Sequence, residues 1–351
     1  MVLVEQEKQV YYQPSFLWLM TGDRRLEDIT KSISNLRAAG VDVIIDRVTG
    51  IDAERRRLRL QADTLPYDIL IIAAGADADK PDCPELDRAG HNLYTPDGAL
   101  EINRAVEDFE RGHVVFLAES LPFKCPPALY EAALMLRSYF ARRGRMRGIY
   151  LSVFTPELKP LSAAGDRPAR AITKALAAQG ISLYTGQHVE SVNPGKRYVR
   201  FSGGEDTHYD LLIYVAAHRA PEAVRKSGLA DESGWVPADP YTLRTAATDV
   251  YAIGDVNRVR LPSGDDLFKS GEFAHFQGLV VAENVAAQIL GRAPKRLFGG
   301  KMGCVIDTGN SALTVIGNIY RRRPNLLVLP ASRAWRAGKL LAEWQWLREH
   351  G

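Results

Sequence analysis

The sequence is poor in the residues that build disulfide or metal scaffolds. It has three cysteines in 351 residues, Cys83, Cys125 and Cys304, with no CxxC pair and no Cys/His cluster of metal-ligand spacing. It also lacks an apolar run long enough to span a bilayer and a signal-peptide pattern at its start. We therefore expect no metal, disulfide framework or membrane span. The cysteines are either inert, or two of them meet in the fold.

The sequence also lacks a large excess of either positive or negative charge. Lys and Arg number 45 against 42 Asp and Glu, and the resulting net charge of +3 gives no support to nucleic-acid binding. With 46% hydrophobic and 25% charged residues, the composition is that of a globular protein. A chain of 351 residues is long enough for two or more domains with cores of their own.

Residues 112–136 read as a buried strand, Val114 to Ala118, a tight turn, and a helix from about Pro126. This order opens a nucleotide-binding βαβ unit, where glycines in the turn normally let the backbone approach a pyrophosphate. The present turn has no glycine, so a nucleotide phosphate is not expected there. It places Cys125 at a helix N-terminus beside Lys124, two features that lower a cysteine pKa. The turn therefore predicts a reactive thiolate.

An internal repeat indicates two similarly built halves. Tyr67-Asp-Ile-Leu-Ile-Ile-Ala-Ala at residues 67–74 returns as Tyr209-Asp-Leu-Leu-Ile-Tyr-Val-Ala at 209–216. Continuous apolar strands of this kind are buried on both faces of an α/β sheet. We predict an α/β protein with two Rossmann-like domains: residues 1–112 with 241–296, which form a discontinuous first domain, and 113–240. Residues 297–351 form a small C-terminal region.

Several other elements follow from the patterns. Val2 to Glu5 reads as a strand ending in an acid, and Arg24 to Ala39 as an amphipathic helix ending at Gly40. Gly303 to Ile319 predicts a hairpin with its turn at Gly309-Asn310. Ser332 to His350 predicts a helix with three tryptophans and three leucines.

These segments together resemble one family of flavoproteins. The resemblance is carried by Val2–Glu5 with Pro14–Trp18, Tyr67–Ala76, Lys124–Glu131, Val250–Val256, Phe268–Asn284 and Cys304. In order and spacing they are similar to the sulfide:quinone oxidoreductase and flavocytochrome c sulfide dehydrogenase branch of the two-dinucleotide-binding-domain flavoproteins. The match extends over almost the whole chain.

The resemblance implies FAD as the cofactor. Glu5 would hold the adenosine ribose, the turn at Ala73, Ala74 and Gly75 would pack beside the cofactor, and Asp255 after Gly254 would bind the ribityl chain. The helix starting near Gly271 would point its positive end at the flavin. It also implies a redox pair, Cys125 and Cys304, at the flavin face, with Glu131 beside it.

The sequence departs from the family in two places. Relatives carry a strand and a G-x-G-x-x-G loop before the strand that opens this chain, so we expect an N-terminally truncated first domain without its first βα unit, or a true start upstream of Met1. Some relatives carry a third cysteine that aligns near Tyr94, with a histidine at Gly98. This chain has neither residue, so that alignment excludes a mechanism that needs three cysteines.

The implied reaction is oxidation of sulfide or a related sulfur compound. Hydrosulfide would attack a bridge between Cys125 and Cys304, leaving a persulfide and a thiolate, and electrons would pass through FAD to a quinone. The alternatives are an NAD(P)H-dependent flavin reductase of the type II NADH dehydrogenase kind, and a non-catalytic remnant unable to hold FAD.

The location of the chain follows from its tail. Arg321–Arg323 and the basic, tryptophan-rich helix after it suit peripheral contact with a membrane that holds the quinone. The alternative is a helix that caps the flavin domain or enters a dimer interface, so a homo-oligomer stays open. We expect a cytoplasmic protein, with peripheral attachment to the inner membrane as the second possibility.

Overall fold

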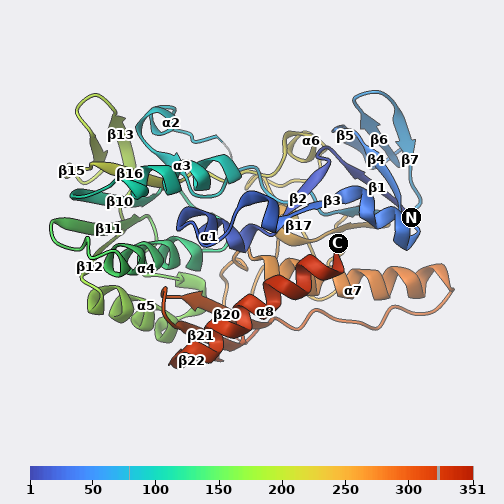
Figure 1. Cartoon of the computed structure of the whole chain (residues 1–351). Coiled ribbons are helices and arrows are strands. Elements are labelled where there is room, and N and C mark those ends of the chain that lie inside the picture. Colours follow the sequence, from blue (N-terminus) through green and yellow to red (C-terminus); the bar gives the residue numbers. More distant parts are fainter. Residues whose placement is uncertain (79, 322–324, 351) are drawn as a thin grey trace.

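The structure, a computed structural model, describes residues 1–78, 80–321 and 325–350. Two α/β units lie at opposite ends of the molecule, and the C-terminal strands and last helix pack along one side (Figure 1). This arrangement confirms the predicted α/β class with two Rossmann-like units and a small C-terminal region.

The second unit is built on a five-stranded parallel sheet. Its strand order is β12-β11-β10-β16-β9, with bounds β9 His91–Asn92, β10 Gly112–Ala118, β11 Ile149–Thr155, β12 Ile181–Thr185 and β16 Leu211–Val215. One face is covered by α3 (Pro96–Glu107), α4 (Pro127–Arg142) and α5 (Asp166–Ala178). The other face packs on α2 (Glu85–Ala89) and the antiparallel sheet β13 Val189–Asn193, β14 Tyr198–Phe201 and β15 Asp206–His208. Burial on both faces explains the apolar runs in β10 and β16.

The first unit has shorter and more separate strands. It comprises the parallel pairs β1 (Val2–Glu5) with β4 (Asp42–Ile45) and β8 (Leu70–Ile72) with β18 (Val250–Ala252). An antiparallel sheet, β5 Val48–Asp52, β6 Arg57–Leu60 and β7 Thr64–Pro66, stands beside them. The prediction of one continuous buried strand over 67–76 was wrong, because only three residues pair and Ile71 is 38% exposed.

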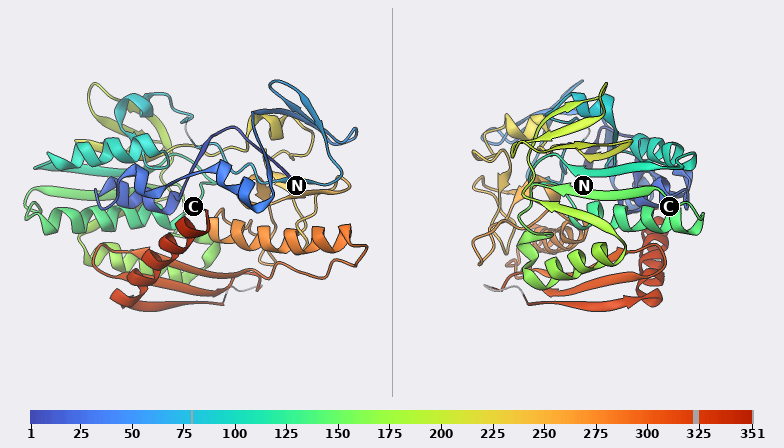
Figure 2. Two further views of the ribbon diagram at one scale, coloured as in Figure 1. Left: turned by 45° about the vertical axis from the view of Figure 1, so that its right-hand side comes forward. Right: turned by 90° about the vertical axis from the view of Figure 1, so that its left-hand side faces the viewer.

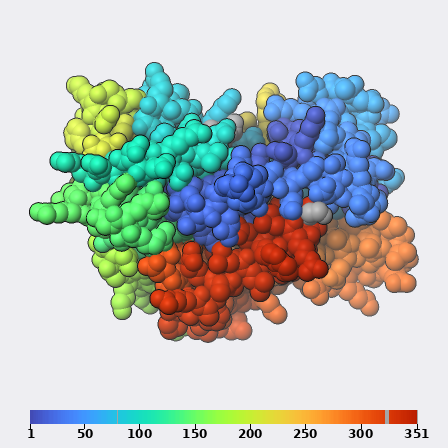
Figure 3. All heavy atoms as spheres, in the orientation of Figure 1, coloured from blue at the N-terminus to red at the C-terminus, as the bar shows by residue number. Residues whose placement is uncertain are grey.

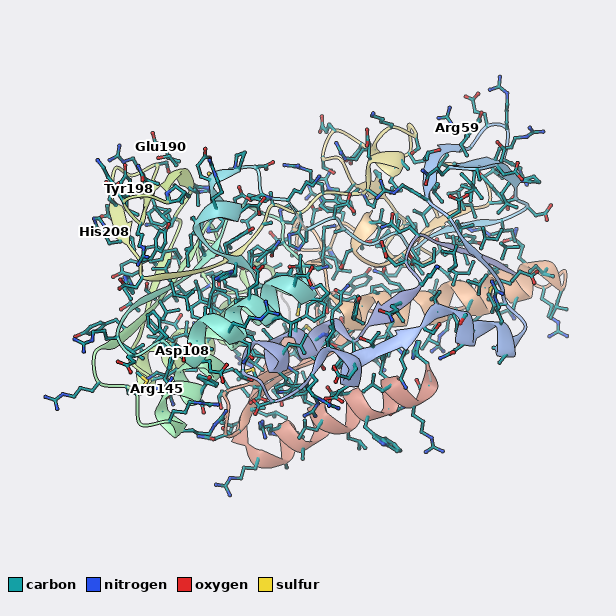
Figure 4. The ribbon with its side chains drawn as sticks, turned by 45° about the horizontal axis from the view of Figure 1, so that its top comes forward. Arg59, Asp108, Arg145, Glu190, Tyr198 and His208 are labelled. Atoms are coloured by element: carbon teal, nitrogen blue, oxygen red, sulfur yellow. The ribbon has the colours of Figure 1, made fainter. Side chains whose placement is uncertain are left out.

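The two units carry their small antiparallel sheets at opposite ends of the molecule. Figure 4 shows Arg59, on β6, at one end, and Tyr198 and His208, on β14 and β15, at the other. The predicted domain boundaries stay a prediction. The structure adds that β9 pairs with β16 and so belongs to the second sheet.

The helix predicted over 24–39 is wrong. The segment forms two 3-10 turns, η2 (Leu26–Ile29) and η3 (Ile33–Ala39), separated by β3 (Thr30–Ser32), which pairs with β2 (Gln9–Tyr11). Thr30 turns its hydroxyl to the carbonyl of Leu26 and its backbone to Tyr11, so the strand pairing interrupts helical hydrogen bonding. The predicted end holds, since Gly40 caps the segment at φ +77°. A short helix, α1 (Phe16–Met20), precedes it.

The remaining elements join the two units. They are α6 Glu222–Arg225, β17 Val236–Pro237, the 3-10 turn η5 Gly254–Val256, β19 Asn257–Arg258 and the long helix α7 Gly271–Ile289. The C-terminal sheet contains β20 Lys301–Asp307, β21 Ala312–Asn318 and β22 Asn325–Ser332. It confirms the predicted hairpin, with Gly309 at φ +91° in the turn.

The last helix, α8 (Arg333–Glu349), runs along β20 and β21 and reaches the N-terminal segment. Figures 2 and 3 show this C-terminal part packed beneath the second unit and against N-terminal residues. Ser332 caps the helix by accepting the N–H of Ala334, as its sequence favours. The inner side of this helix carries the charged residues Arg336, Lys339 and Glu343, and apolar residues lie outside. Leu341 and Trp344 are 61% and 55% exposed.

Candidate active site at the unit junction

Cys125 lies in the turn between β10 and α4, held by contacts from three segments. Its φ is +46°, a left-handed conformation that is uncommon for cysteine. Its N–H donates to the carbonyl of Lys269 at 2.7 Å, and the hydroxyl of Tyr94 donates to the carbonyls of Lys124 and Cys125 at 2.6 and 3.0 Å. Tyr94 therefore helps to fix the strained backbone of Cys125.

The prediction of a low thiol pKa at Cys125 was wrong for this arrangement. Burial raises the pKa to about 11, and the nearby Glu131 carboxylate adds to the rise, while the Lys339 ammonium opposes it. Desolvation of the thiolate outweighs the helix N-terminus because the sulfur is buried at the junction of the units.

Cys304, in the middle of β20, is brought to the same place although 178 residues separate it from Cys125 in the chain. Its pKa is raised by burial, then by negative charge on Cys125 and Glu131, so the two thiols lie close enough to interact electrostatically. Both are free thiols in the structure. The structure thus brings together the two cysteines that the family resemblance paired. Their redox role stays a prediction.

Glu131 lies on the first turns of α4 with 4% of its side chain exposed. It contacts the ammonium of Lys339 and accepts the N–H of Asp307 at 2.9 Å. Burial raises the Glu131 pKa, and Lys339 and the Asp307 N–H oppose that rise. One buried carboxylate and one buried ammonium therefore sit beside the two thiols.

A second polar cluster lies next to the thiols, at the end of β18. Asp255 is buried, and its Oδ1 has no hydrogen-bond partner among the described residues. Burial raises its pKa, with Lys124 and Lys269 acting against the rise. Burial also lowers the pKa of Lys269 to about 8. A buried carboxylate without a donor costs free energy, so Asp255 is suited to a cofactor that brings hydroxyl donors, such as the ribityl chain of FAD.

His218 completes this cluster. Its Nδ1 lies 2.8 Å from the carbonyl of Ala216, and its Nε2 is buried with no partner in the part of the chain that the structure describes. Tyr94 packs edge-on against its ring, with centroids 5.3 Å apart. Two unpartnered buried polar atoms in one cluster indicate a missing polar ligand.

The other predicted cofactor residues lie in turns and at the ends of strands and helices. Gly254 has φ +72° and precedes Asp255, Gly75 has φ +66° after β8 and the exposed Ala73 and Ala74, and Gly271 is the first residue of α7. Gly254 N–H donates to Gln277 on α7 at 2.7 Å, which ties the turn to the helix. Glu5 ends β1 and accepts the N–H of Glu7 at 3.1 Å. The residues present fit an FAD at its ribityl and flavin end.

The second unit has its own acidic residue at the nucleotide position. Glu157 follows β11, where a Rossmann unit places the acid that binds an adenosine ribose. The Glu157 carboxylate is buried and already accepts hydrogen bonds from the protein. The hydroxyl of Tyr130 donates to it, and the N–H of Ser162 donates at 3.3 Å. A ribose would have to displace Tyr130 from α4.

Cys83 lies elsewhere, in a separate core cluster, and its Sγ donates to Glu85 at 3.4 Å. Sequence reasoning missed Lys339, Lys269 and Glu272. Their signal was weak: Lys339 stood among the tail residues as a surface charge, and only its place one turn after Arg336 on the inner side of α8 could have marked it. Glu272, whose pKa burial raises to about 7, accepts the N–H of Gly303 beside Cys304.

Comparisons with known proteins find oxidoreductases among the relatives of this chain. The family model described as pyridine nucleotide-disulphide oxidoreductase matches residues 138–278. The mitochondrial sulfide:quinone oxidoreductase of Mus musculus is 23% identical over 337 residues, which cover 92% of this chain and 73% of that protein. The chain is thus similar to sulfide:quinone oxidoreductases over most of its length. The domain match and these relatives support an FAD-dependent oxidoreductase.

Solved structures share the fold. The sulfide:quinone oxidoreductase of the hyperthermophilic bacterium Aquifex aeolicus superposes with a TM-score of 0.88 at 19% identity, covering 99% of this chain and 85% of that one. NDH2 from Plasmodium falciparum, solved in complex with NADH, gives a TM-score of 0.75 at 14% identity and covers 99% of this chain and 89% of its own. The fold is thus common to sulfide- and NADH-related flavoproteins, and the site residues must separate them.

The membrane prediction is only partly addressed. Across residues 1–78, 80–321 and 325–350, no helix has the length and apolar character needed to cross a bilayer. Of the predicted basic run, Arg322 and Arg323 lie outside the described residues.

Proposed function

We propose that this oxidoreductase oxidises sulfide, or a related small sulfur compound, through Cys125 and Cys304 and passes the electrons by way of FAD to a quinone. The observation that carries the proposal is the meeting of these two thiols, from α4's turn and from β20, beside Glu131 and next to the unpartnered Asp255. A pair of interacting thiols at a cofactor pocket suits two-electron sulfur chemistry.

The first step is thiol–disulfide exchange on the oxidised pair. Hydrosulfide attacks the Cys125 sulfur, the S–S bond breaks, and the products are a Cys125 persulfide and a Cys304 thiolate. The Lys339 ammonium interacts electrostatically with both sulfurs and would stabilise the charge that moves between them. Glu131 is placed to take the proton that hydrogen sulfide or the persulfide releases. FAD, when bound, supplies the two-electron acceptor for the pair and the link to the quinone.

Residues at Asp255 would hold that cofactor. The Asp255 carboxylate would accept ribityl hydroxyls, while the buried ammoniums of Lys124 and Lys269 favour added negative charge on a neighbouring flavin. The N-terminus of α7 adds positive potential in the same direction.

The outer side of α8 is the surface that would contact the membrane in which the quinone is dissolved. Trp335, Leu341 and Trp344 are exposed there, with Arg348 stacked over the Trp344 ring at 5.4 Å. Aromatic and aliphatic side chains flanked by arginine suit a helix that lies in the interfacial layer of a bilayer. We assign this face to peripheral membrane contact, as an alternative to a subunit interface.

The second unit argues against NAD(P)H as the donor. The turn before α4 has no glycine, and the acid that would bind a ribose, Glu157, is buried under Tyr130. Both features remove the phosphate and ribose contacts on which a dinucleotide site depends.

Stopped-flow absorbance of the FAD-loaded chain tests the proposal. We expect sulfide to reduce the flavin and NADH to leave it oxidised, with reoxidation by a short-chain quinone. Reduction by NADH but not by sulfide would replace the proposal with the NADH dehydrogenase-like alternative. A purified chain that stays colourless after incubation with FAD would favour the non-catalytic remnant.

A further inference from the structure

We propose that Lys339 is a positioning residue of the thiol site: the last helix brings its ammonium into contact with Glu131 and within electrostatic range of the two cysteines, where it holds the carboxylate ionised and favours the thiolate form of both sulfurs. The proposal rests on the proposed function in one respect, since it assumes that Cys125 and Cys304 react as thiolates. It adds a residue from outside the two nucleotide units to the machinery of the site.

The geometry begins with the inner side of α8. Arg336 donates to Asp307 at 3.1 Å, Lys339 contacts Glu131, and Glu343 pairs with Arg24 at 2.7 Å and accepts the Ser15 hydroxyl at 2.6 Å. The three contacts follow successive turns, so the helix docks through a ladder of ion pairs with partners from β20, α4 and the N-terminal segment. Lys339 is the most buried cation of the ladder, with 10% of its side chain exposed.

Among the described cations of the ladder, Lys339 is the one that acts on the thiols. Lys339 interacts with Glu131 on α4, Cys304 and Asp307 on β20, Cys125 in its turn and Tyr12 near the N-terminus. Two further carboxylates act on the sulfurs: Asp255 at η5 on Cys125, and Glu272 on α7 on Cys304. Glu131, Asp255 and Glu272 oppose a thiolate here, and Lys339 is the cation that opposes them at both sulfurs.

An uncompensated carboxylate beside two thiols would make both sulfurs poor nucleophiles. Removing one partner of a buried ion pair leaves the other charge unpaired, and the carboxyl then gains a proton or repels the thiolate. Lys339 prevents both outcomes because it contacts Glu131 directly and lies within the range of the sulfurs. The neighbouring Arg336 cannot replace it, since its guanidinium is engaged by Asp307 and Trp18 donates to the same carboxylate at 3.2 Å.

Alkylation kinetics of the FAD-loaded, full-length chain test this assignment. In a Cys83→Ser background, the rate of iodoacetamide modification of Cys125 and Cys304 is followed by mass spectrometry from pH 6 to 11. We expect Lys339→Met to displace the rising limb of the pH–rate profile, and with it the inferred midpoint, upward by one pH unit or more, which slows alkylation at pH 8 about tenfold. Lys339→Arg should restore most of the wild-type rate, because it returns the charge.

Arg336→Met is the matched control, because it removes an ion pair from the same face of α8 and leaves Lys339 in place. An equal shift in Arg336→Met and Lys339→Met would mean that docking of the helix alone matters, and an unchanged midpoint in Lys339→Met would also overturn the proposal. Should Lys339→Met fail to fold, Glu131→Gln serves in its place, with a predicted downward shift. If Lys339→Met shifts the pH dependence of alkylation but sulfide does not reduce the flavin of the wild-type chain, the proposed function is wrong and the role of Lys339 is retained.

Discussion

The strand that begins after Tyr67-Asp68 and the strand that begins after Tyr209-Asp210 occupy corresponding places in the two α/β units, yet their surroundings differ. In the second unit β16 pairs on both sides, with β10 and β9, and all five of its residues are buried. In the first unit, among the described residues, β8 pairs with β18 alone, and its central residue, Ile71, is exposed. Similar strand sequences thus give one dense sheet and one sparse sheet.

This contrast suggests that one unit contributes mainly to stability and the other mainly to ligand binding. In the second unit, Glu157, the acid that a nucleotide would need, already accepts hydrogen bonds from Tyr130 and Ser162. The end of the first unit leaves Asp255 Oδ1 buried and without a donor among the described residues. We infer that the dense unit supplies a rigid frame and the thiol of Cys125, while the sparse unit supplies the cofactor pocket.

The largest expected effect tests whether the dense unit takes part in the chemistry. Cys125→Ser or Cys304→Ser should lower sulfide-dependent flavin reduction by about 10³-fold or more, because a hydroxyl cannot form the exchange bridge. Stopped-flow absorbance measures the rate. Cys83→Ser, which lies in another core cluster, is the control and should retain the rate. Near-normal rates in either active-site variant would confine the chemistry to the cofactor unit.

The second effect compares the two sheets directly. Phe116→Ala on β10 empties a fully buried position and should cost about 3–5 kcal/mol of unfolding free energy. Ile71→Ala on β8 should cost less than about 1 kcal/mol because the side chain is partly in water. Denaturant unfolding of the FAD-loaded chain measures both. Equal losses would contradict a division into a dense and a sparse sheet.

The third effect concerns pH. Burial, and then Lys124, lowers the pKa of His218 in the folded chain to about 3, below the unfolded value of 6.5. The unfolded state therefore binds the proton first, so this contribution is complete above pH 6.5 and is lost as the pH falls toward 3. From pH 7 to 5 the loss should be about 2 kcal/mol.

Urea unfolding at the two pH values checks this. His218→Gln should lose less stability between them than the wild type, and the exposed His275→Gln should behave as the wild type does. An identical pH slope in His218→Gln and wild type would show that the cluster at the junction is open to water.

The smallest effect concerns the link between the units. Tyr94→Phe removes the hydroxyl that holds the carbonyls of Lys124 and Cys125, at a cost of about 1 kcal/mol. We expect a several-fold lower rate of sulfide-dependent flavin reduction with unchanged FAD content, which absorbance at the flavin band reports. A change in FAD content instead would place Tyr94 with the cofactor.

Sequence patterns predicted the dense unit well and the sparse unit poorly, and the reason is physical. Strands β10, β11 and β16 are buried on both faces, so apolar runs mark them, and Gly40 and Gly309 mark real turns. The segment 24–39 was misread because its helical spacing competes with strand pairing to β2, a long-range contact that spacing does not encode.

The site divides in the same way. Family resemblance singled out Cys125, Cys304 and Glu131, which meet in the fold, but nothing local in the sequence ties residue 339 to residue 131. The raised thiol pKa at Cys125 was missed for a related reason: a helix N-terminus and a lysine are visible in sequence, whereas the desolvation that outweighs them depends on the packed junction.

The ion-pair ladder of α8 has a consequence for how the thiol pocket closes. Glu131 on α4 and Asp307 on β20 are buried, and they pair with Lys339 and Arg336 of the same helix. Without that helix, these carboxylates favour water over the closed core. Docking of α8 and closure of the pocket are therefore coupled events.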